Sequence, residues 1–196
     1  RQNYEKQVAM VKETEKILKA GRHVLFSGTP CQIEGLKAYL GKPYENLFCI
    51  DIICYGVPSP KLWDKYVDYR EEQAGATVLK TFFRHKRYGW KRSSILFEYS
   101  NNTEYLKSLR EDTYMQMFFQ NLCLRPSCYA CKFKKKGRVS DITLADFWGC
   151  ENVVPEMDDG KGLSLIIIHS EKGKNILKNI MLKVSIKEVN FDQAIK

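Results

Sequence analysis

The order of apolar and polar positions in the first part of the chain predicts alternating helices and strands. Apolar residues recur at helical spacing in three segments and form short continuous runs in two others. We therefore expect helices over residues 3–20, 31–40 and 60–73 and strands over residues 23–27 and 47–54. Residues 47–54 are apolar almost throughout, as in a strand that is buried on both faces. Ser59 followed by Pro60 is a typical helix start, with Ser59 as the cap.

The second part of the chain adds further strands. Two β-rich segments flank a basic turn, which predicts an antiparallel hairpin, and the apolar stretch between Asp141 and Asp146 has strand length. We expect hairpin strands over residues 77–83 and 94–99, a helix over 113–120, an irregular segment over 121–141, a strand over 162–169, a helix over 171–181 and a last strand over 184–189. With no repeat and no linker, the sequence predicts a single α/β (or α+β) domain over residues 1–196. Its mixed β-sheet is flanked by helices and carries an irregular cysteine-rich loop.

Composition restricts the class of protein. Of the 196 residues, 44% are hydrophobic and 28% are charged, which is typical of a globular protein and excludes general disorder. The longest apolar runs have four residues, so no membrane span is expected. The net charge of +9 suits nucleic acid, anionic cofactors or acidic redox partners equally well. Because the chain opens at Arg1 and runs directly into a charged helix, we expect it to be a piece of a longer polypeptide.

Seven cysteines stand at positions 31, 49, 54, 123, 128, 131 and 150. Their number is odd, and a chain of this length can form a core without disulfides, so we expect cytoplasmic thiols with a metal or redox role. Cys123, Cys128 and Cys131 have the spacing of plant-type iron–sulfur loops. The same spacing suits a structural zinc site, and either metal would take its remaining ligand from the other four cysteines.

Two further cysteines directly follow or end predicted strands. Cys31 comes after the strand over residues 23–27, at the start of a helix, and Cys54 ends the strand over residues 47–54. Ligands gather at the carboxyl ends of strands in α/β sheets, and a helix N-terminus favours a thiolate or a phosphate. Neighbouring strand ends can therefore bring Cys31 and Cys54 together. Cys49, in contrast, lies inside an apolar strand and is expected to be a packing residue.

Five motifs stand in order along the chain. They are Gly28-Thr29-Pro30-Cys31-Gln32, Asp51-Ile52-Ile53-Cys54-Tyr55-Gly56-Val57-Pro58-Ser59, Phe83-Arg84 with Gly89-Trp90, Arg125-Pro126-Ser127-Cys128-Tyr129 with Cys131, and Asp141-Ile142-Thr143-Leu144-Ala145-Asp146-Phe147-Trp148-Gly149. Together they resemble the C-terminal domain of the coenzyme F(420) hydrogenase/dehydrogenase beta-subunit family. The resemblance implies a flavin-dependent iron–sulfur oxidoreductase, in which FAD passes electrons between a [4Fe–4S] cluster and a hydride acceptor, such as coenzyme F(420) or another organic acceptor.

The resemblance also implies particular cluster ligands and partners. Cys31, Cys54, Cys128 and Cys131 match the cluster cysteines of the family, and Cys123, which the loop spacing favours, is the reserve ligand. The N-terminal half that is usual in the family, often with a ferredoxin-like segment, is absent from this sequence. A ferredoxin-like domain or a hydrogenase or dehydrogenase subunit is the expected protein partner.

Glycine, threonine, basic and acidic residues are the candidates for binding FAD. They are Gly28, Thr29, Arg84, Lys86, Arg87 and Asp146. The basic ones belong to a cluster around Tyr88 and Trp90 that extends to Lys91 and Arg92, and a second basic run, residues 132–138, follows the cysteines. These cations can form a solvated face, bind the FAD pyrophosphate or an anionic substrate, or, as the least expected option, contact nucleic acid. Asp146 could bond the flavin ribityl chain.

A different class of function remains open for the same residues. A zinc-stabilised module could use its basic face to bind nucleic acid or an acidic protein. The flavin and cluster interpretation predicts that the four cysteines approach one another. It also predicts that the basic segment lines a concave surface near the cysteine loop.

Overall fold

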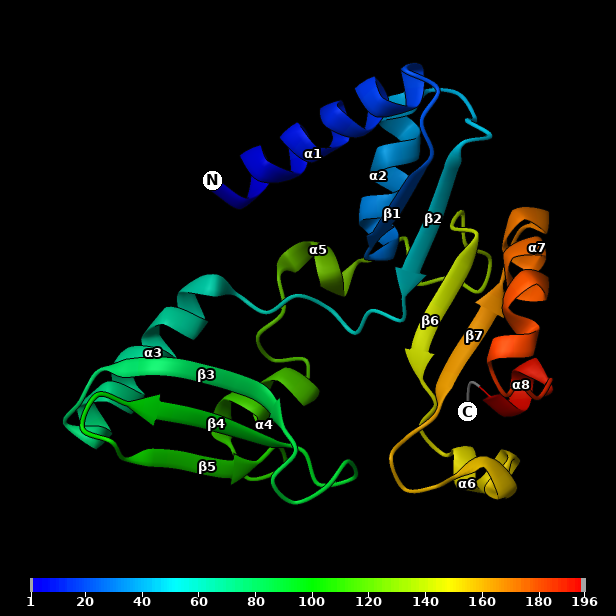
Figure 1. Cartoon of the computed structure of the whole chain (residues 1–196). Helices are drawn as coiled ribbons and strands as arrows, with labels where there is room; N and C mark the ends of the chain where they lie inside the picture. The colour runs from blue at the N-terminus through cyan, green and yellow to red at the C-terminus, as the bar shows by residue number, and fades with distance from the viewer. Residues whose placement is uncertain (1, 195–196) are drawn as a thin grey trace. The chain divides into compact units, whose positions relative to one another are not determined.

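The computed structural model describes residues 2–194 (Figure 1). Side chains are described from residue 5 onward. The chain divides into two compact units. The first contains the residues up to Cys54, residues 132–157 and the residues from Leu163 onward, and the second contains residues 55–131 and 158–162. The single domain expected from the sequence stays a prediction.

The first unit is built on a mixed sheet. Its strands are β1 (Val24–Gly28), β2 (Leu47–Ile52), β6 (Ile142–Asp146) and β7 (Ser164–Ile168), in the order β1-β2-β6-β7. The first three are parallel, and β7 is antiparallel to β6. The helices are α1 (Gln2–Lys19), α2 (Pro30–Leu40), α6 (Cys150–Val153), α7 (Glu171–Ile180) and α8 (Phe191–Ala194), with 3-10 turns η1 (Pro155–Met157) and η2 (Met181–Lys183). This mixed sheet with flanking helices confirms the predicted α/β class.

One face of this sheet is packed and the other is largely open. The packed face is formed by Leu18 of α1, by the apolar side of α2 and by buried strand residues; this core contains Leu18, Phe26, Ile33, Leu36, Leu40, Leu47 and Cys49. On the opposite face Leu25 is 65% exposed and Ile52 is 48% exposed. Burial along β2 therefore alternates, and the expectation that this strand is buried on both faces is wrong. An apolar run in the sequence indicates that neither face of the strand is strongly polar, but it does not show that helices cover both faces.

Two buried carboxylates fasten the sheet internally. Asp51 accepts a hydrogen bond from the Thr143 hydroxyl, whose oxygen lies 2.8 Å from Nε2 of His169. Asp141 accepts hydrogen bonds from the Cys49 amide at 2.7 Å and from the hydroxyl of Ser170, the cap of α7, at 2.5 Å. Because each oxygen of Asp141 has a partner, its role is to join β2 to the start of α7.

The second unit is an antiparallel sheet with helices. Its elements are α3 (Pro60–Ala74), β3 (Val78–His85), β4 (Ser94–Tyr99), β5 (Glu104–Ser108), α4 (Thr113–Phe119) and α5 (Pro126–Tyr129), and the strands pair in the order β3-β4-β5. Aromatic rings from the sheet and both longer helices meet in its core, as Tyr66 of α3, Phe97 of β4 and Tyr114 of α4 do. The predicted hairpin corresponds to β3 and β4, while β5 was not predicted.

Several local predictions need correction. Residues 184–189 form no strand; Val189 instead packs against the cluster around Phe147, and Lys187 forms an ion pair with Glu156. The segment 121–141, expected to be irregular, contains the short helix α5. Ser59 does occupy the N-cap of α3, but its side chain makes no capping hydrogen bond. Proline at the first helical position, with its fixed backbone angle, is therefore the stronger part of that helix start.

Candidate functional site

The turn after β1 presents Cys31 to solvent. Thr29 caps α2, and its amide donates to Oε1 of Gln32 at 2.8 Å. A Cβ atom at Gly28 would lie only 2.9 Å from that same Gln32 oxygen. Glycine at position 28 therefore leaves room for the Gln32 side chain to reach the Thr29 amide. The Thr29 hydroxyl lies 3.1 Å from the sulfur of Cys31, which is exposed in the first turn of the helix. Gly28 and Thr29 therefore shape the turn that positions this thiol.

A pocket lies beside the carboxyl ends of β2 and β6 in the first unit. Its volume is about 600 Å³, and it is lined by Ile52, Ile53, Leu144, Ala145, Asp146, Trp148, Ser164, Leu165 and Ala194. The amide of Ile53 donates to the carbonyl of Leu144 at 3.3 Å, which continues the strand pairing up to Cys54. The pocket thus combines apolar walls, one aromatic ring and one carboxylate next to a predicted cluster ligand. Sequence reasoning identified Asp146 but missed the apolar wall.

In the second unit, the cysteine segment is held against the chain that precedes α3. Pro58 and Leu124 form an isolated antiparallel bridge. The Ser59 amide donates to the carbonyl of Cys123, and the Arg125 amide donates to that of Val57, both at 2.8 Å. The loop is closed further by Tyr129, whose hydroxyl donates to the Asn121 carbonyl at 2.6 Å and accepts from the Leu124 amide at 3.1 Å. The predicted cysteine-rich loop is therefore a hydrogen-bonded structure.

The three cysteines of this loop have different surroundings. The sulfur of Cys128 accepts a hydrogen bond from the Val57 amide at 3.4 Å, and Cys128 and Cys131 are both partly exposed. Cys123 is only 6% exposed, and burial raises the pKa of its thiol. Since a metal ligand must be a thiolate, the burial of Cys123 opposes the ligand role, whereas Cys128 is partly exposed and has an amide donor beside its sulfur.

The remaining cysteines are divided between the units. Cys31 and Cys54 belong to the first unit and Cys128 and Cys131 to the second, so the expected convergence of these four stays a prediction. Cys49 has no exposed surface and lies in the core of the first unit, as the sequence indicated. Burial raises the pKa of its thiol to about 11.

The basic segment around Trp90 is partly neutralised by carboxylates. Arg87 pairs with Glu104 at 2.8 Å, and Lys91 pairs with Asp158 at 3.1 Å. The guanidinium of Arg84 lies 5.4 Å from the centre of the Trp90 ring. Exposed ion pairs of this kind contribute at most about 1 kcal/mol, so an anionic ligand could displace them. The contacts by Arg84, Lys86 and Arg87 with FAD expected from the sequence stay predictions.

The charged residues after the cysteines belong to the first unit and form contacts within it. Lys135 pairs with Glu34 of α2 at 2.8 Å, and Arg138 lies 3.9 Å from the buried Asp51. These contacts give part of the second basic run a structural role.

Among the described residues, no helix is long and apolar enough to cross a membrane.

Comparison with known proteins agrees with the motif order. A search of curated proteins finds no match to the chain. The model of the family described as the C terminus of the coenzyme F(420) hydrogenase/dehydrogenase beta subunit matches residues 21–194, which is nearly the whole chain. The chain therefore belongs to the C-terminal domain family of the coenzyme F(420) hydrogenase/dehydrogenase beta subunits.

Proposed function

We propose that the chain is the flavin- and iron–sulfur-dependent domain of an oxidoreductase, which passes electrons between a [4Fe–4S] cluster, FAD and a hydride acceptor such as coenzyme F(420). Membership of the family supports the general class of activity and a partner subunit of the hydrogenase or dehydrogenase type. The two cofactors and the hydride acceptor are our proposal and go beyond that general class. The observation that carries the proposal is the hydrogen bond from the Val57 amide to the sulfur of Cys128.

The cysteine loop fits a cluster by the chemistry of its donors. Cluster sulfurs and their ligands gain stability from amide hydrogen bonds, and such bonds help to set the reduction potential. Cys128 has such a donor, and Cys131 follows three residues later in the same partly exposed loop. Cys31 and Cys54 are the other two ligands that we propose, each placed at the carboxyl end of a parallel strand. Cys123 is the weaker candidate because its thiol is buried.

The apolar pocket fits part of a flavin. About 600 Å³ lies in the usual range for cofactor sites, and apolar walls suit the isoalloxazine ring system. Asp146 can accept a hydrogen bond from a ribityl hydroxyl, while Trp148 offers a ring face. When bound, FAD supplies the conversion between one-electron and two-electron chemistry. The chain binds and orients the ring system.

Serine substitutions test the ligand assignment. Cys128→Ser and Cys131→Ser should each lower the iron and sulfide content of protein purified without oxygen, together with the broad absorption near 400 nm. Cys123→Ser is the matched control, since it alters a thiol of the same loop and should leave the iron content unchanged. Loss of iron only in Cys123→Ser would contradict the assignment and favour the spacing of the loop over the family pattern.

A pair of leucines tests the flavin pocket independently of iron. Leu144 lines the pocket, whereas Leu25 lies on the same open face of the sheet, outside the pocket. Leu144→Gln should weaken FAD binding by roughly tenfold, because a polar group replaces an apolar wall. Leu25→Gln should leave binding within about twofold of the original protein. Equal FAD affinity in both variants, measured by quenching of flavin fluorescence, would show that the ring binds elsewhere.

A further inference from the structure

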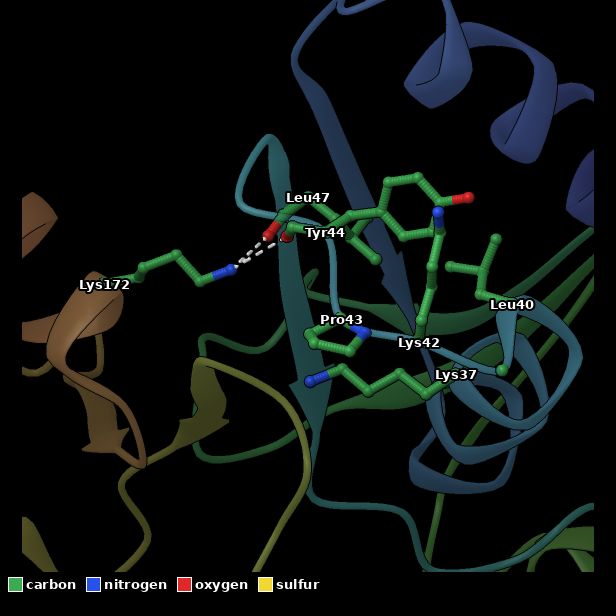
Figure 2. Close-up of a pocket in the computed structure, with 8 residues that line it drawn as sticks. Lys37, Leu40, Lys42, Pro43, Tyr44, Leu47 and Lys172 are labelled. Atoms are coloured by element: carbon green, nitrogen blue, oxygen red, sulfur yellow. Dashed lines mark hydrogen bonds between the residues drawn. The ribbon is translucent and has the colours of Figure 1, made fainter.

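A second pocket lies at the opposite end of the strands of the first unit's sheet. It is formed where α2 ends and β2 begins, at the amino ends of the parallel strands, whereas Cys31 and Cys54 follow the carboxyl ends. Its volume is about 320 Å³, and it is lined by Lys37, Leu40, Gly41, Lys42, Pro43, Tyr44, Leu47 and Lys172 (Figure 2). The pocket is therefore separate from the flavin pocket proposed above.

Three lysines line this pocket and no acidic residue does. Lys172 reaches from α7 and donates to the carbonyls of Tyr44 at 3.2 Å and Leu47 at 2.9 Å, as Figure 2 shows. Lys37 donates to the carbonyl of Val139, and the ammonium of Lys42 lies 5.2 Å from the centre of the Tyr44 ring. All of these partners are neutral. Within the described part of the chain, residues 2–194, the three lysines form no ion pair, and Lys42 interacts only at longer range with the Glu15 carboxylate.

The position of Lys172 at the start of a helix is unfavourable for a positive charge. Lys172 lies in the first turn of α7, where the positive end of the helix dipole disfavours a cation and favours an anion. Lys37 and Lys172 both lower the pKa of the buried Cys49 thiol, whereas burial and the Asp141 and Asp51 carboxylates raise it. Both side chains line the same partly enclosed space, where the fields of their ammonium groups add.

The walls of the pocket limit what kind of anion fits. Leu40, Pro43 and Leu47 provide apolar surface, and Tyr44 provides a ring. The volume is at the lower end of the range for small-molecule sites and is far too small for a nucleic acid. Lysine ammonium groups bind phosphate oxygens through charge-assisted hydrogen bonds. We propose that this pocket binds a phosphate monoester with a small apolar body, with the phosphate between Lys37 and Lys172.

Phenyl phosphate is a suitable probe, because it joins a dianion to an apolar ring. Calorimetric titration of the protein should show saturable binding at one site, with inorganic phosphate binding more weakly because it does not reach the apolar wall. Lys172→Gln should weaken phenyl phosphate binding by about tenfold or more. Lys178→Gln is the matched control: it removes the same charge from the same helix at an exposed position, and binding should stay within about twofold.

A second variant keeps the proposal testable if Lys172→Gln unfolds. Lys42 is exposed and lies over the Tyr44 ring, so Lys42→Gln should keep the unfolding temperature and still weaken phenyl phosphate binding several-fold. The proposal is overturned if phenyl phosphate shows no saturable binding. It is also overturned if Lys42→Gln binds as the original protein does, or if Lys178→Gln weakens binding as much as Lys172→Gln, since general surface charge would then explain the effect.

Discussion

Asp112 has no exposed surface, although it is a carboxylate. It caps α4 by accepting from the Met115 amide at 2.9 Å, and it also accepts from the hydroxyls of Tyr66 and of Tyr105, the latter at 3.1 Å. Burial and the neighbouring carboxylate raise the pKa of Tyr66, which therefore stays a hydrogen-bond donor. This single residue joins α3, β5 and α4 into one core.

Removing one of these donors should destabilise the second unit. Tyr66→Phe leaves a lone pair of the buried carboxylate unsatisfied and should lower the free energy of unfolding by about 1–3 kcal/mol. The control is Tyr69→Phe in the same helix, because that ring is 49% exposed, and its loss of a hydroxyl should change stability by less than about 0.5 kcal/mol. Urea unfolding measures both variants. Equal stability of the two would mean that the Tyr66 hydroxyl contributes nothing.

His169 should make the stability of the first unit depend on pH. Burial lowers its pKa, which the neighbouring Asp51 charge only partly opposes. The folded state therefore binds a proton less readily than the unfolded chain, so stability is complete above the ordinary histidine pKa of about 6.5 and is lost as the pH falls below it. His169→Gln should flatten this loss between about pH 7 and pH 5. An unchanged slope in the variant would assign the acid sensitivity to another group.

At the scale of elements, two helical glycines have opposite surroundings. A Cβ atom at Gly173 in α7 would lie 2.5 Å from the backbone oxygen of Asp141, whereas at Gly35 in α2 nothing lies within 4 Å. Gly173→Ala should therefore push α7 from the sheet and destabilise the protein by about 1–3 kcal/mol. Gly35→Ala should stabilise it by about 0.5–1 kcal/mol, because alanine favours the helix. Thermal unfolding that moves both variants in the same direction would contradict this packing.

The longer elements could be predicted because their signals are local. The helix starting at Pro60 has a proline at its first position and Gly75 as its C-cap, and the strands of the first unit are apolar runs with turns at their ends. The strand Glu104–Ser108 was missed because its alternation is short and its pairing with β4 depends on a turn at Asn102 with a positive φ of 62°. Helices of four residues, such as α6 and α8, are too short to show a period.

The candidate site was predictable in its thiols and not in its walls. Cysteine spacing and motif order indicate Cys128 and Cys131 as candidate ligands. The pocket proposed for the flavin is lined by Ile52, Leu144 and Leu165, which come from three strands. An apolar residue in a strand looks the same in the sequence whether it lines a pocket or the core. The burial that distinguishes Cys123 from Cys128 and Cys131 also arises from tertiary packing, which the spacing of the cysteines does not reveal.

At the scale of the whole molecule, the proposed chemistry needs cysteines from both units. Each unit has its own core and its own hydrogen-bonded setting for two of the four cysteines. The open face of the first unit adds an apolar pocket beside Cys54, and the opposite end of the strands of the same sheet carries the lysine pocket. The proposed redox site and the proposed anion site would thus lie at opposite ends of the strands of one α/β sheet.

The metal content of the protein tests the central claim most directly. Protein purified without oxygen should be brown and should contain iron and acid-labile sulfide in equal amounts, with absorption near 400 nm that bleaches on reduction. The zinc alternative predicts a colourless protein whose thiols hold zinc in a tetrahedral site. Stoichiometric zinc with neither iron nor sulfide would contradict the account.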